Sequence, residues 1–157
     1  MFDHSPVEIR GPWDHDEVGR FLARSVIPLR IGVTTPSGWP LVLSVWFVPV
    51  RDELLAATRP TSTLVRCLRE RPRCGFEVAG DTPPYHGIRG RAEVVLDHSA
   101  GAATLDRLLE RYLGGRTSPL AERLRHDASD EVCIRLRPVS VISWDYRARM
   151  ASSLDGP

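Results

Sequence analysis

A cluster of hydroxyl and guanidinium side chains in the middle of the chain could hold an anionic ligand. It stands directly before a segment in which Leu64, Val65 and Leu68 recur at helical spacing. A helix start offers unpaired amides and a positive dipole end. One arginine guanidinium can donate two parallel hydrogen bonds to a phosphate. The cluster is therefore a candidate phosphate site, made of Thr58, Arg59, Thr61, Ser62, Thr63 and Arg66. The alternative is an ordinary helix that Ser62 or Thr63 caps.

The rest of the chain shows no side chains arranged to catalyse a reaction by themselves. No serine stands in a Gly-x-Ser-x-Gly turn, and no strand is followed by Gly-x-Gly-x-x-Gly. The chain contains no lysine, which excludes a Schiff base and a P-loop lysine. We expect no metal site, because no ligand spacing relates His4, His15, His86, His98 and His126. An enzymatic activity would therefore come from a bound cofactor.

Length and composition indicate one folded domain with no nucleic-acid or membrane partner. The 157 residues suffice for one core, and a net charge of +1 gives no electrostatic attraction to nucleic acid. No apolar run is long enough for a membrane span, and the N-terminus has no apolar signal region. We expect a cytoplasmic location with buried free thiols, because no pairing motif relates Cys67, Cys74 and Cys133.

Strands outnumber helices in the elements that the pattern predicts. Strands are expected over residues 28–35, 39–50, 53–58, 73–78, 86–96 and 131–146. The segments 39–50 and 53–58 should pair as a hairpin, and the last strand should break near Pro138. A mainly β fold follows, an antiparallel barrel with flanking helices.

Helices are expected over residues 14–22, from 62 or 63 to 71, and over 102–113 and 118–125. Asp14 and Glu17 match a capping box at the start of the first helix, and Gly114 should end the third. Residues 1–13 are polar and contain prolines, so we expect an arm that lies across a partner subunit. The tail over 150–157 should be loose.

Three segments between Pro28 and Val95 occur in an order typical of a known family. One is Thr58–Pro72, with a threonine that closes a strand, a serine at the helix start and a leucine late in the helix. The turn Ser37–Pro40 precedes a strand, and Asp81–Arg91 leads into Gly90-Arg91-Ala92. Together these segments resemble the FMN-binding split β-barrel superfamily, the pyridoxamine 5′-phosphate oxidase-like proteins.

The resemblance implies a Greek-key split barrel that binds FMN, or the deazaflavin F420, at the interface of a homodimer. It places the phosphate at the strand-to-helix cluster defined above. The ring would lie against Leu43, Ser44, Val45 and Trp46. Trp144 and Tyr146 would reach the pocket of the same chain or of the partner. The alternative for Trp46, and still more for Trp144, is a packing role.

The expected function is an FMN-dependent oxidoreductase acting on a small organic molecule. The alternatives are an F420-dependent reductase and a non-catalytic protein that binds flavin or haem. Family oxidases carry Arg-Lys after the serine, where this chain has Thr63 and Leu64, so Arg59 or Arg66 must supply the charge. The segment 144–149 lacks the oxidase substrate motif, so pyridoxamine phosphate is not the expected substrate. The candidates for a catalytic acid or base are Tyr85, His86 and Tyr146.

Overall fold

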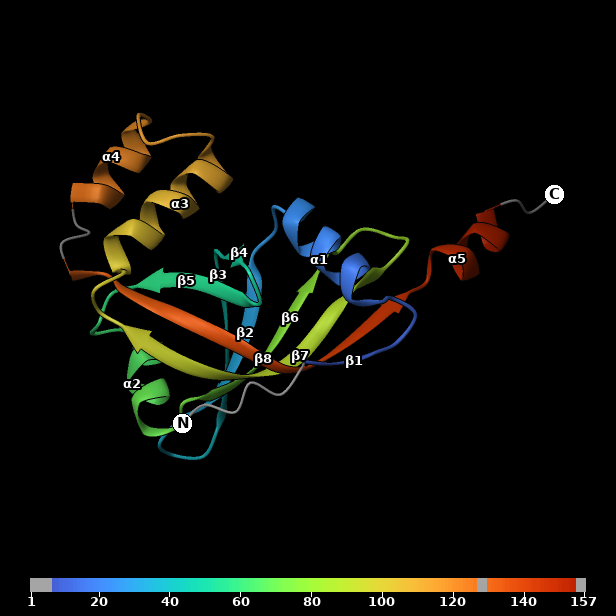
Figure 1. Cartoon of the computed structure of the whole chain (residues 1–157), viewed down its shortest axis with the longest axis horizontal. Coiled ribbons are helices and arrows are strands. Elements are labelled where there is room, and N and C mark those ends of the chain that lie inside the picture. The colour runs from blue at the N-terminus through green and yellow to red at the C-terminus, as the bar shows by residue number, and fades with distance from the viewer. Residues whose placement is uncertain (1–6, 127–129, 155–157) are drawn as a thin grey trace.

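The chain forms one curved sheet with helices at its margins (Figure 1). The computed structural model describes residues 7–126 and 130–154, and side chains up to residue 151. The helices are α1 (His15–Arg24), α2 (Thr63–Glu70), α3 (Gly101–Leu113), α4 (Pro119–His126) and α5 (Arg147–Leu154). The strands are β1 (Glu8–Arg10), β2 (Leu29–Thr34), β3 (Pro40–Val45), β4 (Val48–Val50), β5 (Glu53–Thr58), β6 (Arg73–Ala79), β7 (His86–Asp97) and β8 (Val132–Asp145).

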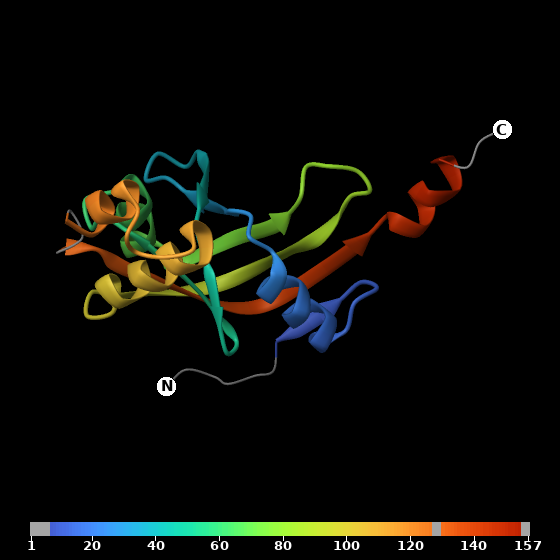
Figure 2. The same ribbon diagram turned by 90° about the horizontal axis from the view of Figure 1, so that it is seen from above.

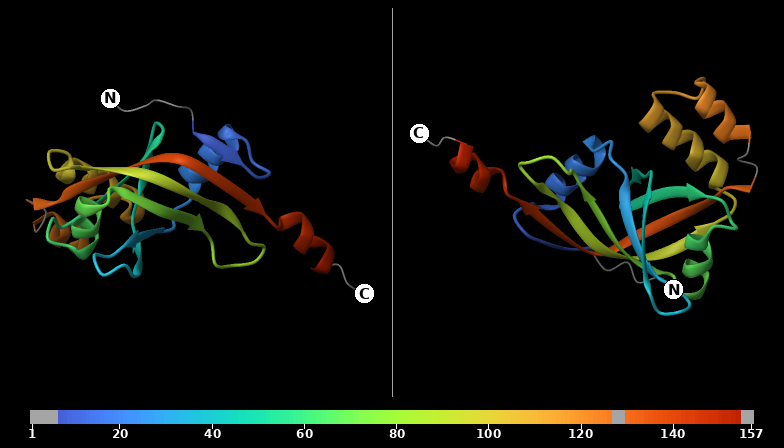
Figure 3. Two further views of the ribbon diagram at one scale, coloured as in Figure 1. Left: turned by 90° about the horizontal axis from the view of Figure 1, so that it is seen from below. Right: turned by 180° about the vertical axis from the view of Figure 1, so that it is seen from behind.

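The sheet curls into a half-barrel (Figures 2 and 3). Its order is β3-β2-β6-β7-β8-β5-β4, and β1 pairs in parallel with β8. β3 and β4 stand at opposite ends of this order, yet only Trp46 and Phe47 join them in sequence. Such a link spans at most about 11 Å, so the two edges of the sheet must come together. The predicted split barrel with flanking helices is confirmed.

The strand predicted over residues 39–50 is wrong, because the structure has two strands there. β3 pairs with β2, whereas β4 pairs with β5, so only the short β4 forms the predicted hairpin. An unbroken apolar run does not reveal where a chain leaves one sheet edge for the other. At this crossing Phe47 is fully buried, and its N–H donates to the Tyr112 hydroxyl at 3.2 Å. That hydroxyl donates to the Ile27 carbonyl at 2.9 Å.

The predicted helix signals at α1 and α3 are confirmed. Asp14 Oδ1 accepts from the Glu17 N–H, and the Glu17 carboxylate accepts from the Asp14 N–H, each at 2.8 Å. α3 ends at Gly114, whose φ of 68° is strained for any residue with a Cβ. These ends follow local rules and need no tertiary contact.

β8 carries the predicted break near Pro138. Arg91 pairs with Ser140 and Ala92 with Pro138, which leaves Val139 as a bulge. On its other edge, β8 pairs with β5 as far as Leu136 and with β1 from Ser140 onward. That edge therefore has a gap at the bulge.

Both ends of the chain differ from expectation. Glu8–Arg10 join the sheet as β1 instead of forming an arm, and the Trp13 N–H donates to Ser143 Oγ at 3.0 Å. The tail forms α5 through Leu154, and it projects away from the sheet (Figure 1). Arg, Ala, Met and Leu favour a helix there. The remaining parts of the predicted arm and tail, residues 1–6 and 155–157, lie outside the described residues.

Two apolar clusters stabilise the fold. The larger fills the barrel, where Leu64, Cys67 and Leu68 anchor α2. In the smaller, Leu105, Leu109 and Ala121 of α3 and α4 pack with Trp46 and Ala57. The prediction of buried free thiols is confirmed for Cys67, Cys74 and Cys133. None of the helices in the described ranges is long and apolar enough to cross a bilayer.

Removing the Tyr112 hydroxyl tests how much its hydrogen bonds stabilise the link at Trp46 and Phe47 between β3 and β4. Tyr112→Phe keeps the ring but leaves the Phe47 N–H and the Ile27 carbonyl without this partner. We expect the free energy of unfolding to fall by about 1–3 kcal/mol. Urea denaturation measures the change, with Tyr85→Phe as the control because Tyr85 is exposed. Equal losses in both variants would contradict a special role for the crossing.

Candidate functional site

The candidate phosphate site lies where β5 passes into α2. Thr58 ends β5 opposite Val132 of β8, and a backbone turn follows in which the Ser62 N–H donates to the Arg59 carbonyl at 3.0 Å. Ser62 is the N-cap of α2, and its Oγ accepts from the Val65 N–H at 3.2 Å. The hydroxyl hydrogen is not used by that bond, so it can donate to a ligand.

The charges around this turn favour an anion. The first turn of α2 contains no acidic side chain, whereas the first turn of α1 contains two, Asp16 and Glu17. The positive end of the α2 dipole is therefore not neutralised within its own helix. Thr61, Thr63, Arg59 and Arg66 are all exposed beside it. The structure thus brings the predicted phosphate residues together at one helix start.

Glu131 is an acidic neighbour that the sequence did not point to. It precedes β8, and its carboxylate interacts electrostatically with Arg59. Burial raises the pKa of Glu131, and the charge of Arg59 opposes that rise. An anionic ligand would compete with Glu131 for this guanidinium. Protonation of Glu131 would favour the ligand in that competition.

The residues predicted to line a ring lie on β3, an edge strand. Leu43 and Val45 are half-buried against the barrel core, and Ser44 between them is exposed. An edge strand presents backbone N–H and C=O groups that its sheet does not use. β3 can therefore offer backbone hydrogen bonds to the polar edge of a flat ligand.

Trp46 has a packing contact that explains its position without a ligand. Its ring stacks on Tyr112, with centroids 4.9 Å apart and planes within 5° of parallel. This contact belongs to the cluster under α3 and α4. The packing alternative raised for Trp46 has a concrete partner, and the ligand role stays a prediction.

Trp144 lies far from the phosphate site within one chain. It is twelve residues along β8 from Val132, the partner of Thr58, and at roughly 3.3 Å per residue that is about 40 Å for a straight strand. Figure 1 shows β8 running from the α2 side of the sheet to α5. The Arg89 guanidinium lies 5.6 Å from the centre of the Trp144 ring. One chain does not bring Trp144 and Ser62 together.

The candidate acids and bases lie at the α5 end of the sheet. His86 packs with Trp13 and Phe21, at 6.1 and 6.0 Å between ring centres, and its Nδ1 lies 2.9 Å from the Pro84 carbonyl. Tyr85 and Tyr146 are exposed. His86 thus has a packing role. Among the described residues, Glu131 is the acidic side chain seen to interact with the phosphate site.

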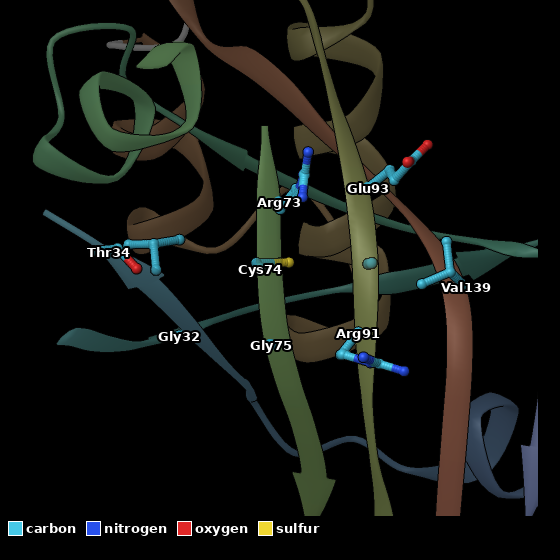
Figure 4. A pocket seen from close by; sticks show the side chains of 10 residues that line it. Gly32, Thr34, Arg73, Cys74, Gly75, Arg91, Glu93 and Val139 are labelled. Atoms are coloured by element: carbon cyan, nitrogen blue, oxygen red, sulfur yellow. The ribbon is translucent and has the colours of Figure 1, made fainter. Parts of the chain in front are cut away.

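A hollow on the outer face of the sheet was missed by the sequence analysis. It has a volume of about 510 Å³ and a floor at Gly32 and Gly75, which pair across β2 and β6 (Figure 4). Arg73, Arg91 and Val139 stand around it. The sequence feature that could have revealed this hollow is a glycine in the interior of each of two strands. Such glycines can mark the close approach of a ligand or of another backbone.

The fold itself does not require glycine at the floor of this hollow. A Cβ at Gly32 would have the Gly75 carbonyl oxygen 3.8 Å away, and one at Gly75 would have the Gly90 oxygen 3.9 Å away. Both are ordinary contacts. Glycine weakens a strand, and its lack of a side chain at both positions leaves the backbone accessible to a ligand or another backbone.

Within residues 7–126 and 130–154, no three His, Cys, Asp or Glu side chains gather as metal ligands do. The donors that do gather are hydroxyls, helix amides and guanidinium groups. This set fits the phosphate of a nucleotide such as FMN.

Comparisons with solved structures establish the fold. The chain matches the conserved hypothetical protein Rv2991 of Mycobacterium tuberculosis with a TM-score of 0.76 and 22% identity, over 88% of this chain and 89% of that one. It matches an F420 reductase at 0.68 and 23%, over 83% and 97%. It matches a putative pyridoxamine 5′-phosphate oxidase of Listeria innocua at 0.61 and 14%, over 80% and 94%. No family model and no curated protein matches the sequence significantly.

Substituting the helix cap separates structure from ligand binding at this site. Ser62→Ala removes the acceptor for the Val65 N–H, so we expect a loss of about 1 kcal/mol in unfolding free energy without any ligand. Thr61→Ala removes the exposed hydroxyl of the preceding residue and should change the unfolding free energy by less than about 0.5 kcal/mol. Thermal denaturation compares the stability of the two variants with that of the unchanged protein. Equal stability of the two would remove Ser62 as the cap.

Proposed function

We propose that this split-barrel protein binds FMN and uses it to move an electron pair to or from a small organic molecule. The observation that carries the proposal is the start of α2, where a free hydroxyl hydrogen, helix amides and two arginines meet without an acid in the first turn. The fold supports it, because structural neighbours with this fold include an F420 reductase and a putative pyridoxamine 5′-phosphate oxidase.

Each part of the site would have a physical task. Thr58, Ser62 and Thr63 would donate hydrogen bonds to phosphate and ribityl oxygens, and Arg59 and Arg66 would neutralise the phosphate. The backbone of Leu43–Val45 would hydrogen-bond the polar edge of the ring. Bound FMN would supply the hydride donor or acceptor. The barrel would hold the ring in a fixed orientation, because β3 and β5 belong to one curved sheet.

A homodimer would complete the site. Gly32 and Gly75 leave the outer face open to a close approach, and Val42 and Val139 are apolar side chains exposed on it, by 66% and 47%. Trp144 is on this face and cannot reach the phosphate site of its own chain. In a twofold dimer through this face, the partner subunit would place its own Trp144 near the ring.

F420 is the second candidate cofactor, and the arginines beyond the phosphate turn favour it. Arg69, Arg71 and Arg73 follow Arg66, and only Glu70 opposes them within this stretch. All three are exposed. F420 carries a longer anionic tail than FMN, so it would use these extra positive charges.

Binding titrations with matched variants test the cofactor site. The double variant Arg59→Ala/Arg66→Ala should bind FMN about a hundredfold more weakly or worse, because two charge-assisted hydrogen bonds are lost. Arg20→Ala/Arg24→Ala removes the same charge from α1 and should bind FMN like the unchanged protein. Quenching of flavin fluorescence measures both. Riboflavin, which lacks the phosphate, should bind the unchanged protein and the first variant equally.

The same titration separates the candidates. If F420 is the cofactor, Arg69→Ala/Arg71→Ala weakens its binding and leaves FMN binding unchanged. If adding haem to the protein produces the absorbance change of a bound ligand and adding flavin does not, the non-catalytic alternative is supported. Equal FMN affinity in all variants, or no binding of either flavin, would remove the proposed site.

The oligomeric state tests the role of the outer face. Sedimentation velocity should give the unchanged protein a mass twice its 17.5 kDa. Gly75→Val should shift it toward the monomer without unfolding it, since valine favours a strand and its Cβ would meet nothing nearer than the Gly90 carbonyl oxygen at 3.9 Å. Gly80→Ala is the control, because an added Cβ at Gly80 meets nothing within 4 Å and Gly80 lies in a loop. A monomeric unchanged protein would contradict the dimer.

A further inference from the structure

A second pocket lies between α1 and the hairpin of β4 and β5. Its volume is about 280 Å³, and β1 and β8 supply the rest of its wall. The lining is mostly apolar and includes Val7, Val18, Leu22, Pro49, Leu54 and Pro138. In Figure 1, α1 and α2 lie at different margins of the sheet, so this pocket is separate from the proposed phosphate site.

The pocket arises from the gap in the edge of β8. β5 pairs with this edge only as far as Leu136, and β1 pairs with it only from Ser140. The bulge lies between them, and Pro138 faces the pocket there. Proline has no N–H, so the unpaired stretch exposes one donor fewer. Pro49 has the same effect on the opposite wall. The wall is therefore poor in backbone donors at Pro138 and Pro49, while His15, Arg51, Asp52 and Glu53 supply its polar side chains.

α1 leaves room for an occupant at Gly19. This glycine is in the middle of the helix and lines the pocket, and a Cβ added to it would meet nothing within 4 Å. Glycine in a helix interior lowers helix stability relative to alanine. Gly19 is exposed, and the absence of a Cβ leaves space beside the helix that an occupant of the pocket can use.

The charges at the rim are balanced within the protein. Glu53 accepts from Arg135 at 2.8 Å and from Arg137 at 2.7 Å. Asp52 lies 4.0 Å from His15 Nε2 and follows Arg51 directly in the chain. Arg135 also donates to Asp97 at 3.1 Å, so three arginines face three carboxylates and no excess charge of either sign is left there to attract an ion.

We propose that this pocket binds a small uncharged apolar molecule, about two fused rings in size. An apolar cavity of about 150 Å³ is known to hold benzene, so about 280 Å³ suits a body of that size. Apolar walls favour such a ligand through the area they remove from water. This site is independent of the flavin site and does not rest on the proposed function.

A pair of fluorescent probes tests both the pocket and its charge preference. N-phenyl-1-naphthylamine is uncharged and brightens in apolar surroundings, and its 8-sulfonate is the matched anion. The uncharged probe should bind at least about tenfold more tightly than the sulfonate, because burying the sulfonate without a partner charge is unfavourable. Saturating FMN should not displace it. Tighter binding of the sulfonate would overturn the proposed class of ligand.

Substitutions in α1 locate the probe. Gly19→Leu should fill the pocket and weaken probe binding at least about tenfold without lowering the melting temperature. Gly19→Ala is the matched control, which should raise the melting temperature and keep most of the affinity. Leu22→Trp fills the pocket from the next turn if Gly19→Leu does not fold. No fluorescence rise in the unchanged protein, or a rise that survives both filling substitutions, would overturn the proposal.

Discussion

The fold depends on how the chain crosses from one edge of its sheet to the other. Two residues, Trp46 and Phe47, make this crossing, and the sheet must curl for them to reach. Phe47 goes into the barrel core, and Trp46 goes to the opposite side, where it stacks on Tyr112. The Tyr112 hydroxyl holds the backbone between them. Two neighbouring side chains on opposite faces thus tie the barrel to α3.

The candidate phosphate site gains its order from this curved sheet. The ladder of β5 with β8 places Thr58, and three buried residues of α2 anchor the helix in the barrel core. The amides at the start of α2 are therefore held in place before any ligand arrives. Such preorganisation lowers the cost of binding. Because every basic side chain except histidine is arginine, the site can offer planar, paired hydrogen bonds to an anion.

One irregularity in β8 shapes two different surfaces. The bulge exposes Val139 to the hollow on the outer face, while Pro138 beside it lines the apolar pocket under α1. A regular strand would have kept pairing along its edge and left less room between β5 and β1. Glycines accompany both surfaces, Gly32 and Gly75 at the hollow and Gly19 at the pocket. At all three the protein gives up local stability where its own packing does not require glycine.

The sequence by itself determined the features that follow from local rules. The capping box at Asp14, the caps at Ser62 and Gly114, the break at Pro138 and most strand positions depend on neighbours in the chain, so they could be predicted. The tertiary structure alone decided the crossing at Trp46, the strand at Glu8–Arg10, the proximity of Glu131 to Arg59 and the distance of Trp144 from Ser62. These depend on pairing between segments far apart in the chain, and side-chain periodicity does not say which edge a strand will meet.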